Sequence, residues 1–188
     1  MFEKLIALAL IAALVWLAWW YFFGKGKPGA VKISGAKWNR QTLTELSVET
    51  PVPLAPVMPK TDHLTPAQRR QIEAHQEWKG ETQGGFLITS TYLKIDGTHT
   101  YSLEGGAQGE MRLIAALCGV SNPAIQKTDV GVDGLPARRL TYTHKRRHFD
   151  EVIVQDSRKI WIVMTCAETE RQTADARRVL QSIRIQRN

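Results

Sequence analysis

Near the N-terminus lies a run of nineteen residues, Leu5 to Phe23, that includes no charged residue, proline or glycine. A helix of this length rises about 28 Å, which matches the hydrocarbon core of a bilayer. A signal peptide would have a shorter apolar region followed by small residues at a cleavage site, whereas this run ends in six aromatic residues within eight positions, typical of a membrane interface. We therefore expect residues 1–23 to form an uncleaved anchor and the protein to cross the membrane once.

The expected anchor also has a surface suited to another helix. Ala9 and Ala13 are four residues apart, with Ala12 beside them. Small residues at this spacing let a second transmembrane helix approach closely. The pattern predicts that Ala9 and Ala13 contact other membrane-protein subunits within the bilayer.

The segment after the anchor indicates on which side of the membrane the folded domain lies. Residues 24–35 are rich in glycine, have no helical or alternating period and are predicted to be a linker to a folded domain at 36–188. Lys25, Lys27 and further basic residues follow the anchor, and this charge bias favours a cytoplasmic domain. Four of the chain's 25 basic and one of its 18 acidic residues precede residue 36, which leaves 21 against 17 and a charge of +4 in the domain. This excess is too small to indicate nucleic-acid binding.

The first part of the domain is predicted to hold strands and one short helix. A strand at Leu46–Val48 runs into a proline-broken segment, and Thr65-Pro66 has the signature of a helix start, with the helix covering Gln68–Ala74. Two further strands, Glu73–Glu81 and Phe86–Ile95, are separated by a glycine-containing turn and should form a hairpin.

The second part is predicted to be a helix, a four-strand meander and a closing helix. Apolar residues from Ala107 to Cys118 share one helical face. The strands that follow are divided by turns at Asp133-Gly134, Lys145–Arg147 and Asp156–Arg158, and tight turns make the sheet antiparallel. Thr169 and Gln172 form a capping box, as Thr65 and Gln68 do. With helices before and after the meander, we expect an α+β fold, a three-layer α/β/α sandwich around a central antiparallel sheet.

Three segments resemble the PsbP and DcrB-like proteins of the Mog/PsbP fold. They are the turn Val132–Ala137 leading into a strand, the apolar strand Ile160–Thr165, and the ending Val179–Ile185, which resembles the closing helix of the family. The resemblance covers about residues 46–185. It implies binding to other proteins instead of catalysis, and it favours a periplasmic domain on a bacterial inner membrane. The chain departs from the DcrB-like pattern in its uncleaved helix and in an insertion at Pro56–Pro66.

The cysteines, the histidines and the sequence motifs give few indications of a catalytic or metal site. Cys118 and Cys166 could close a disulfide bridge, or could be two buried thiols, and the sequence leaves both alternatives open. His144 and His148 flank a basic turn and lack a third metal ligand. No nucleophile, phosphate-loop or dinucleotide motif is present, so we expect no catalysis, no cofactor and no small-molecule substrate.

The run Lys145-Arg146-Arg147 is the remaining candidate, predicted to contact an acidic protein surface or the lipid bilayer, although solubility alone also explains such a run. The sequence thus predicts a membrane-anchored, non-catalytic accessory or assembly subunit of a larger membrane-protein complex. One alternative is a cytoplasm-facing chaperone or adaptor for client proteins, and a weaker one is an envelope hydrolase or metal-binding protein.

Overall fold

The computed structural model describes residues 37–59, 66–97, 102–118 and 124–186 of the chain. The expected anchor and linker, with Ala9 and Ala13, lie outside these ranges. Within them, none of the helices combines the length and the apolar character that a membrane span requires.

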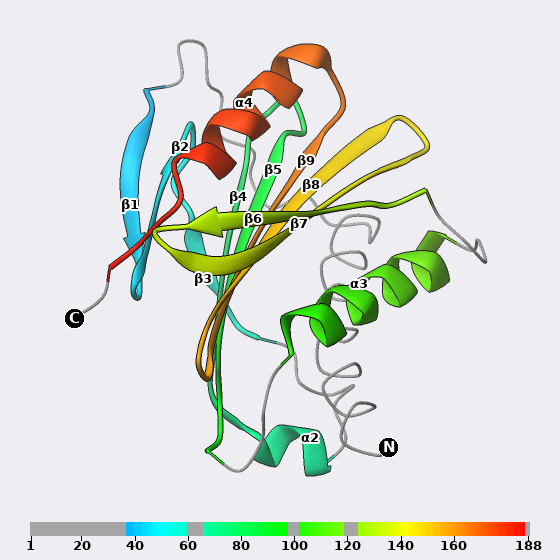
Figure 1. Cartoon of the computed structure of the whole chain (residues 1–188). Coiled ribbons are helices and arrows are strands. Elements are labelled where there is room, and N and C mark those ends of the chain that lie inside the picture. The colour runs from blue at the N-terminus through cyan, green and yellow to red at the C-terminus, as the bar shows by residue number, and fades with distance from the viewer. Residues whose placement is uncertain (1–36, 60–65, 98–101, 119–123, 187–188) are drawn as a thin grey trace.

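The centre of the domain is a seven-stranded antiparallel sheet (Figure 1). It contains both the predicted hairpin and the predicted four-strand meander, joined where β5 pairs with β9 from Leu87↔Cys166 to Lys94↔Lys159. Its edge strands are β3 and β6. In spatial order the strands are β3 (Ala55–Val57), β4 (Ile72–Glu81), β5 (Leu87–Ile95), β9 (Lys159–Ala167), β8 (Arg147–Asp156), β7 (Leu135–His144) and β6 (Gln126–Val132).

A second sheet of three strands was not predicted. Its central strand β2 (Leu46–Thr50) pairs with β1 (Asn39–Leu43) and with β10 (Arg184–Ile185). Residues 184–185 were expected to belong to the closing helix, but that helix ends at Gln181 and the chain then extends to pair with β2. The physical reason is burial, because Ile185 lies in the main core once it is paired with Leu46.

The structure contains three helices among its described residues: α2 (Pro66–Arg70), α3 (Leu103–Cys118) and α4 (Glu170–Gln181). The capping box of α4 is confirmed, since the Gln172 backbone N–H donates to Thr169 Oγ1 at 3.2 Å and the Gln172 side chain accepts from the Thr169 N–H at 3.2 Å. The predicted length of α2 was wrong. Its expected last turn belongs to β4, where Ile72 pairs with Ile95 and packs against the core beneath α3.

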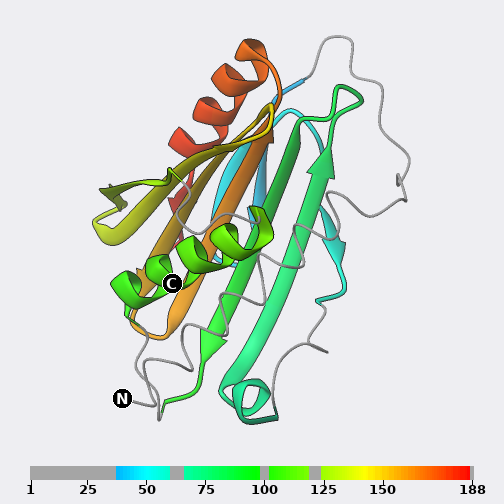
Figure 2. The same cartoon turned by 90° about the vertical axis from the view of Figure 1, so that its right-hand side faces the viewer.

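The three layers follow from residue alternation along the buried strand β9. Ile160, Ile162 and Met164 face the side that α3 covers, whereas Trp161 and Val163 face α4 and the second sheet. Figures 1 and 2 show α3 and α4 on opposite faces of the central sheet. The expected α/β/α sandwich is therefore present, with the second sheet extending the layer of α4.

Candidate functional site

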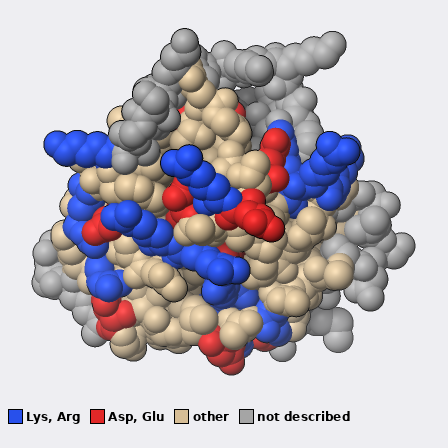
Figure 3. Space-filling model, turned by 90° about the horizontal axis from the view of Figure 1, so that it is seen from above, with Lys and Arg blue, Asp and Glu red and all other residues tan. Residues whose placement is uncertain are grey.

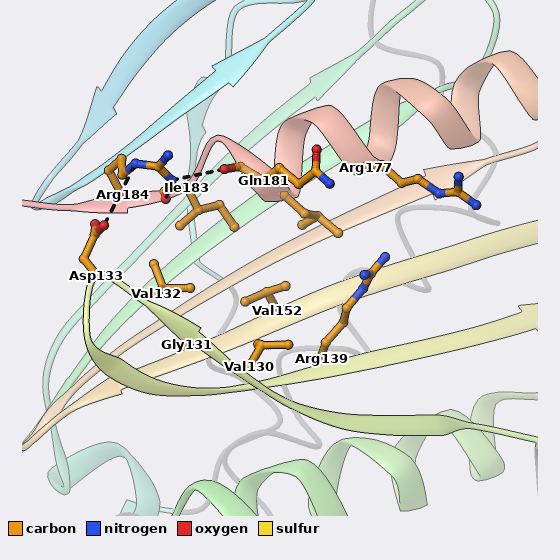
Figure 4. Close-up of a pocket in the computed structure, with 11 residues that line it drawn as sticks. Val130, Gly131, Val132, Asp133, Arg139, Val152, Arg177, Gln181, Ile183 and Arg184 are labelled. Atoms are coloured by element: carbon orange, nitrogen blue, oxygen red, sulfur yellow. Dashed lines mark hydrogen bonds and ion pairs between the residues drawn. The ribbon is translucent and has the colours of Figure 1, made fainter.

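An open groove lies between the end of α4 and the β6–β7 hairpin (Figure 4). Its cavity volume is about 270 Å³. The central sheet forms the floor, and α4 with the segment that follows it forms one wall. The lining residues are Val130, Gly131, Val132, Asp133, Arg139, Val152, Arg177, Leu180, Gln181, Ile183 and Arg184.

The middle of the groove is apolar because of strand alternation. Val130 pairs with Ala137 and Val132 with Leu135, so both valines point to the face of the sheet that α4 covers. Leu180 and Ile183 form the opposite wall and belong to the same core cluster. The groove therefore offers contact area to an apolar group.

One end of the groove is closed by an ion pair at the β6–β7 turn. Asp133 has a positive φ of 51° and is followed by Gly134 at 78°, the geometry of a tight hairpin turn. The carboxylate of Asp133 accepts a hydrogen bond from the Ile185 N–H at 2.7 Å and lies 3.9 Å from the Arg184 guanidinium. The charge of Asp133 is thus engaged within the fold.

The other end carries two guanidinium groups. Arg139 on β7 donates from Nε to Asp150 Oδ1 at 2.7 Å and makes a second contact to Oδ2, and this hydrogen bonding raises the pKa of Arg139. The Asp150 side chain is only 3% exposed, which fixes the position of Arg139. Arg177 extends from α4 into the same space (Figure 4), is exposed, and has no ion pair within the described part of the chain. This end is suited to an anionic group.

Sequence reasoning missed this groove, although part of the signal was present. Arg139 has the same parity along β7 as the buried Ala137, so it had to point toward α4. Arg177 follows the buried Ala176 on α4 and gives no comparable signal, because only the fold brings it near β7.

The basic hairpin, Lys145–Arg147, forms the tip between β7 and β8 as predicted. Figure 1 shows this yellow hairpin extending away from the other strands. Lys145 and Arg146 are exposed, and Lys145 has a φ of 55°, a conformation that favours glycine or asparagine. Arg147 is instead engaged by Glu168, with Nε and Oε1 2.7 Å apart. Figure 3 shows basic and acidic side chains interleaved over the face seen from above, without a continuous field of one sign.

Cys166, His144 and His148 do not line the groove. Cys166 is a buried thiol, and burial raises its pKa to about 12. The side chain of Cys118 lies outside the described part of the structure, so the possible disulfide stays a prediction. His148 Nδ1 lies 3.3 Å from Thr143 Oγ1. Across the described ranges no three side chains are grouped so that they could hold a metal ion.

Two fully buried glutamates lie between α3 and the sheet. Glu110 shares the buried face of α3 with Ala107 and Ile114, and Glu151 on β8 pairs with Leu140 and Met164 beneath that helix. Among the described residues neither carboxyl group has a hydrogen-bond partner. Burial raises the pKa of Glu151 to about 8 and raises that of Glu110 well above its ordinary value, with repulsion from Glu151 adding to it. The spacing of Glu110 from Ala107 and Ile114 would have revealed its position.

The domain has a PsbP-like fold. The solution structure of cyanobacterial PsbP (CyanoP) from Synechocystis sp. PCC 6803 superposes with a TM-score of 0.53 at 14% identity, covering 86% of this chain and 98% of that one. The crystal structure of LpqN, involved in cell envelope biogenesis of Mycobacterium tuberculosis, is a more distant match, with a TM-score of 0.43 at 11% identity over 85% of this chain and 90% of that one. No family model matches the sequence, and no curated protein sequence is significantly similar to it.

Proposed function

We propose that this protein is a non-catalytic binding subunit, anchored in a bacterial inner membrane by residues 1–23, that serves a larger membrane-protein complex. The observation that carries the proposal is the character of the exposed features: an open apolar groove ending in two arginines, and a basic hairpin tip. These are recognition features, since the groove presents apolar area and charge to a partner and the hairpin tip presents charge. The uncharged run 5–23 supplies the attachment to the membrane.

The environments of the titratable groups support a binding role. A nucleophilic cysteine needs a lowered pKa and access, whereas Cys166 is buried and its pKa is raised. Glu110 and Glu151 have the raised pKa values seen in general acids, but no part of either residue reaches the surface. A substrate could not contact these groups without displacement of α3.

We place the domain on the periplasmic side of the membrane. The PsbP-like fold supports this side, following the family resemblance, while the basic residues after the anchor favour the cytoplasm. Single cysteines introduced into the linker 24–35, in a C118S/C166S background, should react with a membrane-impermeant maleimide on intact cells. Reaction only after lysis would place the domain in the cytoplasm and favour a chaperone or adaptor for client proteins.

The partner complex is tested by purification of the full chain in mild detergent, with mass spectrometry of the proteins that accompany it. The variant K145S/R146S removes the two exposed charges of the basic hairpin and leaves the pair between Arg147 and Glu168 intact. We expect it to reduce recovery of the partner. The control K37S/R171S removes two other exposed charges and should not. Equal recovery with both variants would exclude the basic hairpin as the contact.

The anchor is tested separately. In A9I/A13I the larger side chains keep a second helix at a distance, so the variant should lose its partner subunits. It should remain in the membrane fraction, because the run stays apolar. Undiminished co-purification would show that these alanines form no subunit interface.

A further inference from the structure

We infer that the groove and the outer edge of β6 together form a docking site for an extended segment of a partner protein, one that carries an acidic side chain among apolar ones. This inference rests on the proposed function and names the class of partner. The site combines an available strand edge, an apolar groove along that edge and two guanidinium groups at one end of the groove.

The edge of β6 is suited to strand addition. Within the described sheet β6 pairs only with β7, so its other side presents backbone N–H and C=O groups without a strand partner. Its seven residues include no proline. The opposite edge strand β3 has three residues, with Pro56 at its centre, and is a poor template.

Charged residues often protect an exposed edge, but those of β6 are engaged elsewhere. Lys127 contacts Glu104 of α3, with Nζ and Oε1 2.6 Å apart, and Asp129 pairs with Arg138 of β7. Both lie on the face of the sheet that α3 covers. Neither charge is directed at a strand that would approach β6 from its open side.

The groove runs along the half of β6 that holds Val130 and Val132. Successive side chains of an added strand alternate between the two faces of the sheet, so every second one would lie on the groove side. Pockets for drug-sized ligands hold roughly 300–1,000 Å³. The volume of about 270 Å³ and the open shape of this groove suit a few side chains of a peptide better than an enclosed small molecule.

The charges set the position of the acidic residue. Arg184 is already paired with Asp133 at one end of the groove. At the other end Asp150 fixes Arg139, while Arg177 has no ion pair within the described ranges. A carboxylate placed between Arg139 and Arg177 would accept charge-assisted hydrogen bonds from both guanidinium groups, and Arg139 is already held in position by Asp150.

The test measures binding of two blocked peptides to the full chain in detergent micelles by fluorescence anisotropy. The acidic peptide is VTVTE with an N-terminal dye and a C-terminal amide, and the neutral peptide is VTVTQ with the same ends. The variant R177Q removes the unpaired guanidinium. The control R171Q makes the same change on an exposed part of α4 that does not line the groove.

We expect wild type and R171Q to prefer the acidic peptide about fivefold, the upper end for an exposed charge pair, and R177Q to lose that preference. A preference retained by R177Q, lost equally by R171Q, or absent from wild type would overturn the inference. These results are independent of the purification experiment. If no partner co-purifies with the wild-type chain, the proposed function is refuted, whereas failure of the peptides to bind while the complex is intact would refute only the groove.

Discussion

Replacement of Glu151 by glutamine should change how the stability of the domain depends on pH. Glu151 is 0% exposed, and its carboxyl oxygens lack a hydrogen-bond partner among the residues that the structure describes. Burial raises its pKa from the ordinary 4.5 to about 8. Repulsion from Asp150 contributes to this rise. The folded protein therefore holds the proton of Glu151 at pH values where the unfolded chain has released it.

The sign of the effect follows from proton counts. Below pH 4.5 both states bind the proton, and Glu151 adds no pH dependence. Between pH 4.5 and 8 the folded state binds more protons than the unfolded state, so stability falls as pH rises, by about 1.4 kcal/mol per pH unit. At pH 7 the loss amounts to about 3 kcal/mol, a large share of the stability of a domain of this size.

Glutamine cannot ionise, so E151Q should lack this slope. The amide has its own cost as a buried group without partners, about 1–3 kcal/mol, but that cost does not vary with pH. The predicted quantity is therefore the difference between the two proteins, which should shift in favour of E151Q by about 3 kcal/mol from pH 4.5 to pH 7. Glu110 titrates in the same direction and remains in both proteins, but in E151Q its pKa is raised by burial alone, without the repulsion from Glu151.

Urea unfolding of the full chain in detergent, followed by tryptophan fluorescence across this pH range, measures the difference. Trp161 is buried in the core and should report the loss of packing. The control E170Q changes an exposed carboxylate at the start of α4 and should follow the wild-type curve within about 1 kcal/mol. Parallel curves for wild type and E151Q would show that Glu151 is solvated or hydrogen-bonded in the folded protein, and would refute the reasoning.

Three further predictions concern the turns, the packing and the thiol. K145N should raise the thermal midpoint by about 2–4 °C, because asparagine tolerates the positive φ of this position, and a lower midpoint would contradict the assigned backbone. G80A should destabilise the domain by about 1–3 kcal/mol in urea unfolding, since the added Cβ would lie 2.7 Å from Leu54 Cδ2 and 2.8 Å from the Pro53 oxygen. The control G105A should be tolerated, because the nearest atom to its added Cβ is 3.5 Å away. In a C118S background, Cys166 should react with a thiol reagent only as fast as the domain opens, because the thiol is buried and its pKa is about 12; rapid reaction at pH 7 would refute its burial.

The elements that the sequence predicted well are those formed by neighbours in the chain. Tight turns at Asp133-Gly134 and at Ser157 join strands that pair with each other, and the capping box at Thr169 depends on four consecutive residues. The second sheet could not be predicted in this way. Its pairing of Arg184 with Ser47 joins segments 137 residues apart, and neither strand shows a long alternating pattern.

The residues of the candidate site show the same difference between neighbours in the chain and residues that only the fold brings together. Lys145–Arg147 is continuous in sequence and was identified, whereas Arg177 and Arg139 come together only through the packing of α4. Glu151 was missed for another reason. It precedes Val152, Ile153 and Val154 in a strand buried on both faces, so alternation gave no warning that this glutamate also points inward.

The position of the groove follows from the dimensions of the layers. Seven strands about 4.8 Å apart span roughly 29 Å, while a helix with its side chains is about 10–12 Å wide and covers two or three strands. α4 packs on β8 and β9, and the second sheet shares its core with β5, so this layer ends before it reaches the last hairpin. On the opposite face α3 lies on β7 and β8, and Glu104 binds Lys127 and Arg138 there. The β6–β7 hairpin is therefore supported from one side and left open on the other, which is why an apolar strip bordered by arginines remains accessible beside α4.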